Sequence, residues 1–306
     1  MTTTISSVQV PEHLEHRITT SDGRTVAVAE WGDPDGLPLI AIHGTPGSRI
    51  SWWDDPTIYA RHGLRRLTVD RPGYGDSTRR QGRSVADFVA DIAAVADGLG
   101  VDRFAITGGS GGGPHVLAAA ALMPDRVIRC LAQVSVAPYG PDGLARERWL
   151  AGQTTGNVAE FEAALAGEAE IREICVSERS TIFERLAAGH PNLLGDNYVL
   201  AEADREQMRR HWSQMAGQIG EALKDGVDGW VDDDLAFVRP WGVDVADIRV
   251  PVRLVYGRAD TLVPAAHGDW LAAHIPGAVA EVSDVGHMGS DEDVERHMGW
   301  LAGEWE

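Results

Sequence analysis

Cysteine and long apolar runs are both scarce in this chain, and each scarcity excludes a class of protein. The two cysteines, Cys130 and Cys175, have no regular spacing, so neither a disulfide framework nor a zinc cluster is expected. No apolar run reaches the roughly 20 residues of a membrane-spanning helix. The first 17 residues lack the basic start and apolar core of a signal peptide. We therefore expect a cytoplasmic protein.

Positive charge is also in short supply. The chain has a single lysine, Lys224, and its 27 basic residues face 46 acidic ones, which gives a formal net charge of −19. Nucleic acids and anionic membrane surfaces bind basic faces, so neither is an expected partner. With 43% hydrophobic and 24% charged residues the composition is that of an ordinary globular protein. We expect a small-molecule substrate as the partner, and a monomer and a homodimer fit equally well.

Short apolar runs alternate with helical patterns in the first half of the chain and again near its end. Strands are expected at residues 24–33, 38–44, 64–73, 103–107, 127–136, 250–257 and 278–282. Helices are expected at residues 84–100, 114–123, 265–274 and 291–305. This alternation predicts an α/β fold with a mostly parallel central sheet and helices on both faces.

The alternation stops between residues 139 and 247. Long amphipathic stretches at 157–189 and 197–223 predict helices, and no convincing strand occurs among them. We therefore expect a core domain formed by residues 1–138 and 248–306, and an inserted helical domain formed by residues 139–247. Acidic residues dominate the stretch 157–189, where they fit either a solvated helix face or a set of carboxylates that binds a substrate amine.

Five glycines surround Ser110 in the segment TGGSGGGP (107–114). A dinucleotide-binding fingerprint fails because its sixth position, counted from Gly109, is a proline, and a phosphate-binding loop fails because no lysine follows. The pattern that fits is Gly-x-Ser-x-Gly, placed between a predicted strand and a predicted helix. Such a turn exposes the serine hydroxyl and needs tiny neighbours. It predicts Ser110 as a nucleophile and the backbone N–H of Gly111 as an oxyanion donor.

A serine nucleophile needs a histidine to take its proton and a carboxylate to orient that histidine. On this architecture the acid and then the histidine follow the serine, on loops after later strands. Asp260 follows the strand 250–257, and His287 follows the strand 278–282. Asp244 and Asp284 are the rival acids. The other histidines considered as the base lie in helical stretches or in the insertion: His190, His267, His274 and His297.

A second loop, HGTPGSR (43–49), follows the strand 38–44. Its glycines and proline predict a tight turn whose backbone amides face the nucleophile. The N–H of Thr45 is the expected second oxyanion donor, and His43 is expected to brace the loop rather than act as a base.

The segments HGTPGSR, DRPGYGDST, TGGSGGGP, YGRADTLVP and VGHMG together resemble the signature loops of the α/β-hydrolase superfamily, in the usual order. The resemblance covers residues 20–138 and 248–305, and it implies that residues 139–247 form a cap. It also implies Ser110 as nucleophile, Asp260 as acid and His287 as base, with Thr45 and Gly111 in the oxyanion hole and no metal or cofactor. A serine at the turn argues against epoxide hydrolases and haloalkane dehalogenases, which attack with a carboxylate.

Three functions follow from these patterns. The first is a serine hydrolase that cleaves a small ester or lactone, beneath a cap whose Trp and Met residues form an apolar roof. The second is an aminopeptidase, because HGTPG and GGSGGGP are also similar to proline iminopeptidases. Those enzymes usually have a second glycine where Thr45 stands and a tryptophan where Gly111 stands. The third is a non-hydrolytic enzyme or a receptor on the same fold.

Overall fold

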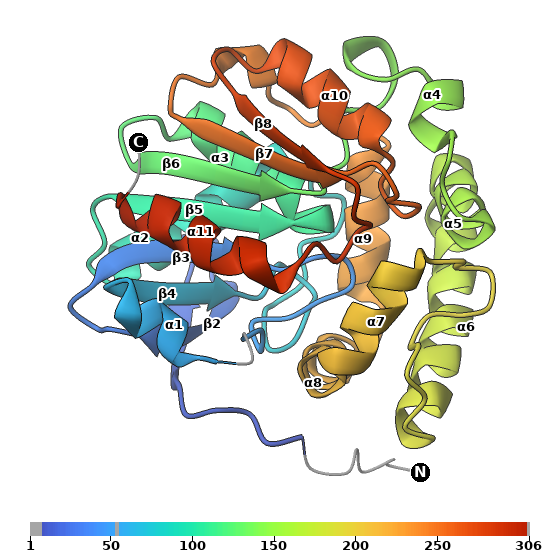
Figure 1. Ribbon diagram of the computed structural model, residues 1–306, viewed down its shortest axis with the longest axis horizontal. Coiled ribbons are helices and arrows are strands. Elements are labelled where there is room, and N and C mark those ends of the chain that lie inside the picture. Colours follow the sequence, from blue (N-terminus) through green and yellow to red (C-terminus); the bar gives the residue numbers. More distant parts are fainter. Residues whose placement is uncertain (1–7, 53–54, 305–306) are drawn as a thin grey trace.

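The computed structural model describes residues 8–52 and 55–304 of the chain. Eight strands form one sheet in the order β1-β2-β4-β3-β5-β6-β7-β8 (Figure 1). The strands are β1 (Leu14–Thr19), β2 (Thr25–Gly32), β3 (Leu37–Ile42), β4 (Leu64–Val69), β5 (Phe104–Gly109), β6 (Val127–Gln133), β7 (Val252–Gly257) and β8 (Val279–Ser283). β2 pairs antiparallel with both β1 and β4, and the other neighbours are parallel. The predicted mostly parallel α/β sheet is confirmed.

Helices cover both faces of this sheet, because the central strands are apolar on both sides. Along β3, Ile40 and Ile42 belong to a large apolar core that includes residues of α2 (Val89–Gly98), α3 (Gly113–Leu122) and α10 (Ala265–His274). Leu39, which points to the opposite face, belongs to a smaller core with residues of α1 (Thr57–Arg61) and α11 (Asp291–Ala302). This alternation within a continuous apolar run is what a strand covered on both faces requires.

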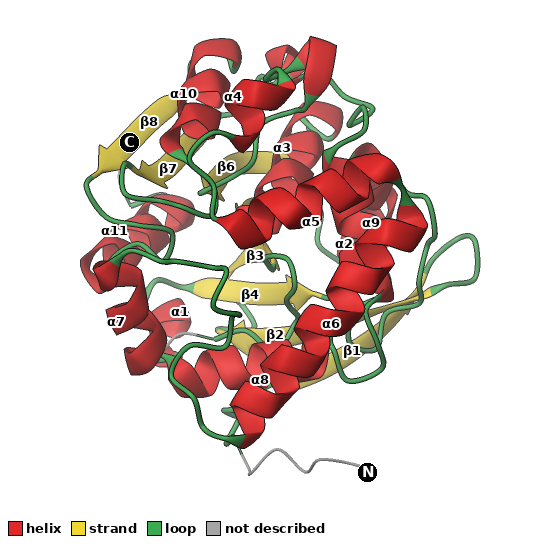
Figure 2. Cartoon of the chain, turned by 90° about the vertical axis from the view of Figure 1, so that its right-hand side faces the viewer, coloured by secondary structure: helices red, strands yellow, loops and turns green. Residues whose placement is uncertain are grey.

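The segment 139–247 contributes no strand to the sheet, and we call it the helical insertion. Its helices are α4 (Arg146–Leu150), α5 (Thr155–Ala166), α6 (Glu168–Ala187), α7 (Glu202–Arg210), α8 (Trp212–Ala222) and α9 (Asp228–Phe237). Helices α5 to α9 lie beyond the arrowheads of the parallel strands (Figure 1), and α5, α6 and α8 lie in front of the sheet when viewed from that side (Figure 2). The insertion therefore covers the end of the sheet where the predicted site residues lie.

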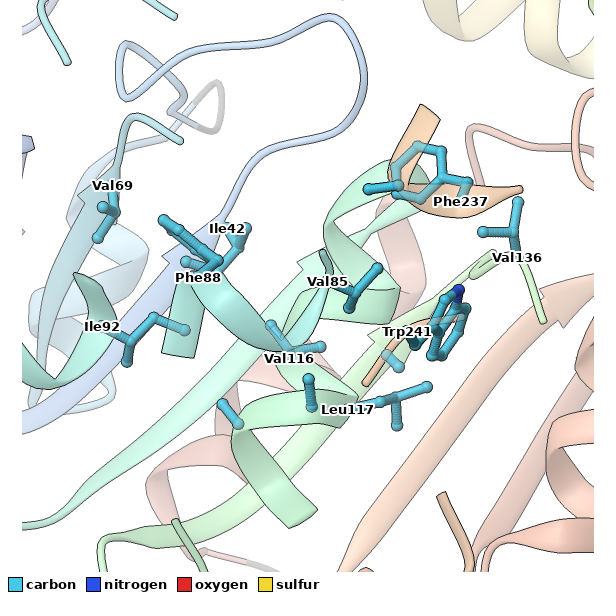
Figure 3. Close-up of a cluster of buried hydrophobic side chains, with 14 of the residues drawn as sticks. Ile42, Val69, Val85, Phe88, Ile92, Val116, Leu117, Val136, Phe237 and Trp241 are labelled. Carbon is cyan, nitrogen blue, oxygen red and sulfur yellow. The ribbon is translucent and has the colours of Figure 1, made fainter. Parts of the chain in front are cut away.

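Helix α9 also joins the insertion to the main core. Phe237 of α9 and the following Trp241 lie in the same apolar cluster as Val85, Val116 and Leu117 (Figure 3). All five side chains are buried. Burial of apolar surface contributes about 25 cal/mol per Å², so these contacts attach the end of the insertion firmly to the α2–α3 side of the molecule.

The structure differs from the predicted elements at a few places. Strand β1 lies in a stretch for which no element was predicted, and the predicted helix at 157–189 is divided at Gly167, whose φ is 146°. The predicted helix at 291–305 ends at Ala302, and residue 305 lies outside the described residues. Both cysteines are free and buried. In the part of the chain that the structure describes, no helix is long and apolar enough to cross a membrane.

Candidate active site

Ser110 stands at a sharp turn between β5 and α3. Its φ is 53°, a left-handed conformation that is strained for a residue with a side chain. A Cβ on Gly108 would lie 2.7 Å from the carbonyl oxygen of Gly112, and a Cβ on Gly112 would overlap the carbonyl oxygen of Ile42. A Cβ on Gly113 would overlap the side chain of Ser135. The tight turn predicted from the glycine pattern is therefore present, and it needs the absence of side chains on both sides of Ser110.

Asp260 and His287 come together at the carboxyl ends of β7 and β8. The Nδ1 atom of His287 donates to Oδ2 of Asp260 at 2.8 Å. The other carboxylate oxygen accepts the backbone N–H groups of Leu262 and Val263 at 2.8 and 2.9 Å. Asp260 is only 4% exposed, so these bonds fix its orientation. The rival Asp244 instead caps a short helical turn by accepting the N–H of Ala246.

The environment of His287 suits a base that becomes an acid during a reaction. Burial lowers the pKa of His287, but the charge and hydrogen bond of Asp260, together with the charge of Asp204, outweigh burial and raise the pKa above its usual value. Because Nδ1 carries the hydrogen that binds Asp260, Nε2 of the neutral ring is left as the acceptor. The pair can thus accept a proton at Nε2 and stabilise the resulting positive charge.

Ser110 lines a cavity at this end of the sheet, together with both residues predicted to supply oxyanion donors, Thr45 and Gly111. The empty volume of the cavity is about 640 Å³, including its open mouth. Leu262 and Val263, whose amides bind Asp260, also line it. Within the described part of the chain, no hydrogen bond joins the hydroxyl of Ser110 to His287.

The two residues predicted to supply oxyanion donors are in direct contact. A Cβ on Gly111 would overlap the hydroxyl of Thr45, so the absence of a side chain at Gly111 lets the loop 43–45 approach the turn. Gly44 is also close, because a Cβ placed on it would lie 3.4 Å from Cβ of Ser110. The loop that follows β3 therefore lies directly beside the candidate nucleophile.

His43 braces this loop, the role expected for it. Its Nδ1 atom donates to the carbonyl of Gly44 at 2.8 Å, and its Nε2 atom accepts the backbone N–H of Arg71 at 3.0 Å. This pattern requires a neutral ring. Burial and the charge of Arg71 lower the pKa of His43 well below its usual value, in agreement with the hydrogen bonds.

Two aspartates of the helical insertion reach the site, and sequence analysis missed both. Asp204 of α7 accepts the backbone N–H groups of His287 and Met288 at 3.0 and 2.8 Å. Asp233 of α9 accepts the hydroxyl of Thr45 at 2.7 Å. Asp204 stands in the charged sequence EADREQMRR, which has the composition of an ordinary surface helix and so gives no signal. A signal for Asp233 exists, because the run of three aspartates at 232–234 lies between apolar residues in a segment too apolar for a solvated helix.

Three carboxyl groups line the cavity above Ser110, namely Glu160, Glu178 and Asp234. Tyr198 and Trp230 donate to Glu160 at 2.9 and 2.6 Å. Burial raises the pKa of Glu160, and burial together with the charge of Glu160 raises the pKa of Asp234 well above its usual value. Burial and the charge of Glu160 also raise the pKa of Glu178.

These three carboxyls bear on one open alternative, the role of the acidic stretch 157–189, and correct one expectation, the apolar roof. Glu160 and Glu178 belong to the acidic stretch 157–189, yet they line the cavity, so a solvated face does not describe them. The roof of the cavity is only partly apolar. It contains Trp230, Phe161 and Ile182 but none of the methionines. The roof therefore combines apolar side chains with an acidic group. In the described residues, no set of three or more His, Cys, Asp or Glu side chains could hold a metal ion.

Comparison with known proteins agrees with this arrangement. The sequence pattern of the alpha/beta hydrolase fold matches residues 38–294. The chain belongs to the α/β-hydrolase family. A non-heme chloroperoxidase from Streptomyces lividans is 28% identical to this α/β-hydrolase over 255 residues (81% of this chain, 83% of the relative). A bifunctional esterase/perhydrolase from Acinetobacter calcoaceticus is 26% identical over 257 residues (81% and 83%). A proline iminopeptidase from Neisseria meningitidis serogroup B (strain ATCC BAA-335 / MC58) is 25% identical over 286 residues (86% of each).

Proposed function

We propose that this α/β-hydrolase is a serine hydrolase that cleaves a small carboxylic ester or lactone through an acyl-enzyme. The observation that carries the proposal is the buried Asp260–His287 pair, with Nε2 as its free acceptor, at the same end of the sheet as the strained Ser110. These are the three groups that nucleophilic acyl transfer needs.

In the proposed mechanism Ser110 attacks the acyl carbon while Nε2 of His287 accepts the hydroxyl proton. The negative charge that forms on the carbonyl oxygen is bound by the N–H groups of Thr45 and Gly111. His287 then donates its proton to the leaving alcohol, and Asp260 stabilises the imidazolium. Water attacks the acyl-enzyme with His287 again as base. No step requires a metal or cofactor.

We also propose that the helical insertion, residues 139–247, acts as a cap domain on a core formed by residues 1–138 and 248–306. In support, α5, α6 and α9 supply most of the side chains above Ser110, including Phe161, Ile182 and Trp230. Pockets lined by apolar side chains with a few fixed polar groups are the usual form of small-molecule sites. The insertion would therefore select the acyl and alcohol groups.

The test compares Ser110→Ala with Ser180→Ala on p-nitrophenyl esters and lactones. Ser180 lies exposed on α6, and its variant controls for the loss of a serine hydroxyl. We expect Ser110→Ala to lower kcat by about 10³-fold or more and Ser180→Ala to stay within about twofold. A fluorophosphonate should label the wild type on Ser110. Full activity of Ser110→Ala would contradict the proposal, and the absence of any adduct would favour a receptor or a non-hydrolytic enzyme.

A second candidate function is an aminopeptidase, and the carboxyls of the cavity favour it. Glu160, Glu178 and Asp234 have no cationic partner among the residues that line the cavity. A substrate ammonium would relieve their mutual repulsion. The proline iminopeptidase similarity points to the same class of substrate.

Glu160→Gln distinguishes the two functions, with Glu162→Gln as its control. Glu162 lies on the same helix and pairs with Arg146 at the surface. For an aminopeptidase, Glu160→Gln should raise the KM for prolyl-naphthylamide about tenfold and leave uncharged esters nearly unchanged, because only the amine substrate binds the carboxylate. No turnover of prolyl-naphthylamide by the wild type would exclude this function.

A further inference from the structure

Arg71 donates hydrogen bonds from its guanidinium to the loop that carries Thr45. Its side chain is fully buried, at 0% exposure. Nη1 donates to the carbonyl oxygen of His43, and Nη2 donates to the carbonyl oxygen of Gly44 at 3.1 Å and to the hydroxyl of Thr45 at 2.8 Å. One guanidinium therefore binds three consecutive residues of the loop.

The bond to Gly44 determines where the N–H of Thr45 points. The Gly44–Thr45 peptide is trans, and in a trans peptide the C=O and the following N–H point in opposite directions. Arg71 and His43 both donate to the Gly44 carbonyl, which holds that oxygen away from the cavity. The N–H of Thr45 then faces the opposite way, and it has no acceptor in the described part of the chain. Thr45 itself lines the cavity beside Ser110.

Asp233 of α9 completes the arrangement. Its carboxylate accepts hydrogen bonds from Nε and Nη2 of Arg71 and from the hydroxyl of Thr45. It also accepts the hydroxyl of Tyr74, at 2.8 Å. Its own side chain is fully buried. A buried ion pair adds little stability compared with apolar residues of the same volume, because desolvation offsets the attraction. Orientation of the loop gives a better account of this pair than stability does.

We infer that Arg71, held by Asp233, is the positioning residue of the oxyanion hole: it fixes the Gly44–Thr45 peptide so that the Thr45 N–H faces the carbonyl oxygen of the bound acyl group. The inference rests on the proposed acyl-transfer function. It also assigns part of the oxyanion hole to the helical insertion, because the carboxylate that holds Arg71 comes from α9.

Arg71→Lys tests this role, with Arg83→Lys as the matched control. A lysine keeps the charge, but it lacks the planar fork with which Nε, Nη1 and Nη2 together bind Asp233, the His43 carbonyl and the Gly44 carbonyl. Its single nitrogen has to give up the bonds of Nε and Nη1, so the loop is held at fewer points. Arg83 is equally buried and pairs with the same Asp233. Its other hydrogen-bond partners are Gly229 and His115, and in the described part of the chain none of its hydrogen bonds goes to the loop 43–45.

We expect Arg71→Lys to lower kcat for a p-nitrophenyl ester about 10- to 100-fold, part of the 10²- to 10³-fold loss seen when a whole oxyanion donor is removed. KM should change by less than about threefold, because the N–H binds charge that exists only in the transition state. A trifluoromethyl ketone, which forms an oxyanion on the serine, should bind more weakly by the same factor as kcat/KM falls. Arg83→Lys should change each value by less than about threefold.

Equal losses in the two arginine variants, or a change in KM alone, would overturn the positioning role and leave the proposed function intact. If Arg71→Lys does not fold, Thr45→Val replaces it, because it removes the hydroxyl that ties Thr45 to Arg71 and Asp233. That variant should lower kcat about 3- to 10-fold, and an unchanged kcat would overturn the role. Wild-type protein that neither hydrolyses esters nor reacts with a fluorophosphonate would overturn the proposed function, and the inference with it.

Discussion

Replacement of Asp204 by asparagine tests whether the helical insertion holds the loop that carries His287. Asp204 is 1% exposed, and its two carboxylate oxygens accept the N–H groups of His287 and Met288. Asparagine has nearly the same shape, but it keeps only one acceptor oxygen and turns an NH₂ group toward the second N–H. Hydrogen bonds to charged groups contribute about 1.5–3 kcal/mol each, so we expect the positioned loop to lose about 2–3 kcal/mol.

A loss of about 2–3 kcal/mol corresponds to a 30- to 150-fold decrease in the positioned population, since each 1.4 kcal/mol is tenfold. We expect kcat/KM for a p-nitrophenyl ester to fall by about that factor. The pH profile should change as well. The charge of Asp204 helps to raise the pKa of His287, so its removal should move the acid limb of kcat/KM to lower pH.

The control is Glu202→Gln, an exposed carboxylate on the same helix that pairs with Arg205 and Arg209. It removes the same charge without contact to the His287 loop and should change kcat/KM by less than about twofold. Retention of wild-type kcat/KM by folded Asp204→Asn would show that the loop is positioned without the insertion, and would refute the reasoning.

Three further results are expected. Asp260→Asn should lower kcat about 10³- to 10⁴-fold and move the acid limb of the pH profile to lower pH, because Asp260 raises the pKa of His287; an unmoved limb would contradict this. Folding raises the pKa of Asp234, so the contribution of Asp234 to stability should fall as pH rises above about 4. Urea midpoints at pH 5 and 8 should differ less in Asp234→Asn than in the wild type. Gly112→Ala places a Cβ against the carbonyl oxygen of Ile42 and should lower the free energy of unfolding in urea by about 1–3 kcal/mol. Gly109→Ala, whose Cβ would lie 3.9 Å from its nearest neighbour, the carbonyl oxygen of Gln133, should lower it by under about 1 kcal/mol.

The elements of the sheet were predictable wherever their side chains are buried on both faces. Strand β3 is a continuous apolar run, and such runs between glycines are typical of parallel strands. Strand β1, with the sequence LEHRIT, is mostly exposed at the edge of the sheet, so its polar composition gave no signal. The division of α5 from α6 at Gly167 depends on one positive φ that the helical pattern on either side conceals.

The residues of the candidate site also fall into those that the sequence could predict and those that it could not. Ser110, Asp260 and His287 could be predicted because each follows a strand, and the carboxyl ends of parallel strands lie at one edge of a sheet. Asp204 was missed because nothing local marks it, and Asp233 was missed because the apolar residues around the run 232–234 indicate burial but not which partner the carboxylate binds. Their partners lie 83 and 188 residues away in the chain. A charged residue on a helix has the same sequence signature whether it faces water or a backbone amide across an interface.

Asp233, which the insertion contributes to the interior beneath it, limits which insertions this chain could accept. A different insertion placed between β6 and β7 would remove Asp233 and leave Arg71 and Arg83 buried without their carboxylate. An uncompensated buried charge costs about 3–5 kcal/mol, a large fraction of the stability of a typical protein. An insertion from a relative can therefore be grafted here only if it brings an equivalent acid, or if both arginines are replaced at the same time. The sheet and the insertion thus depend on each other for stability, even though the chain connects them only at two points.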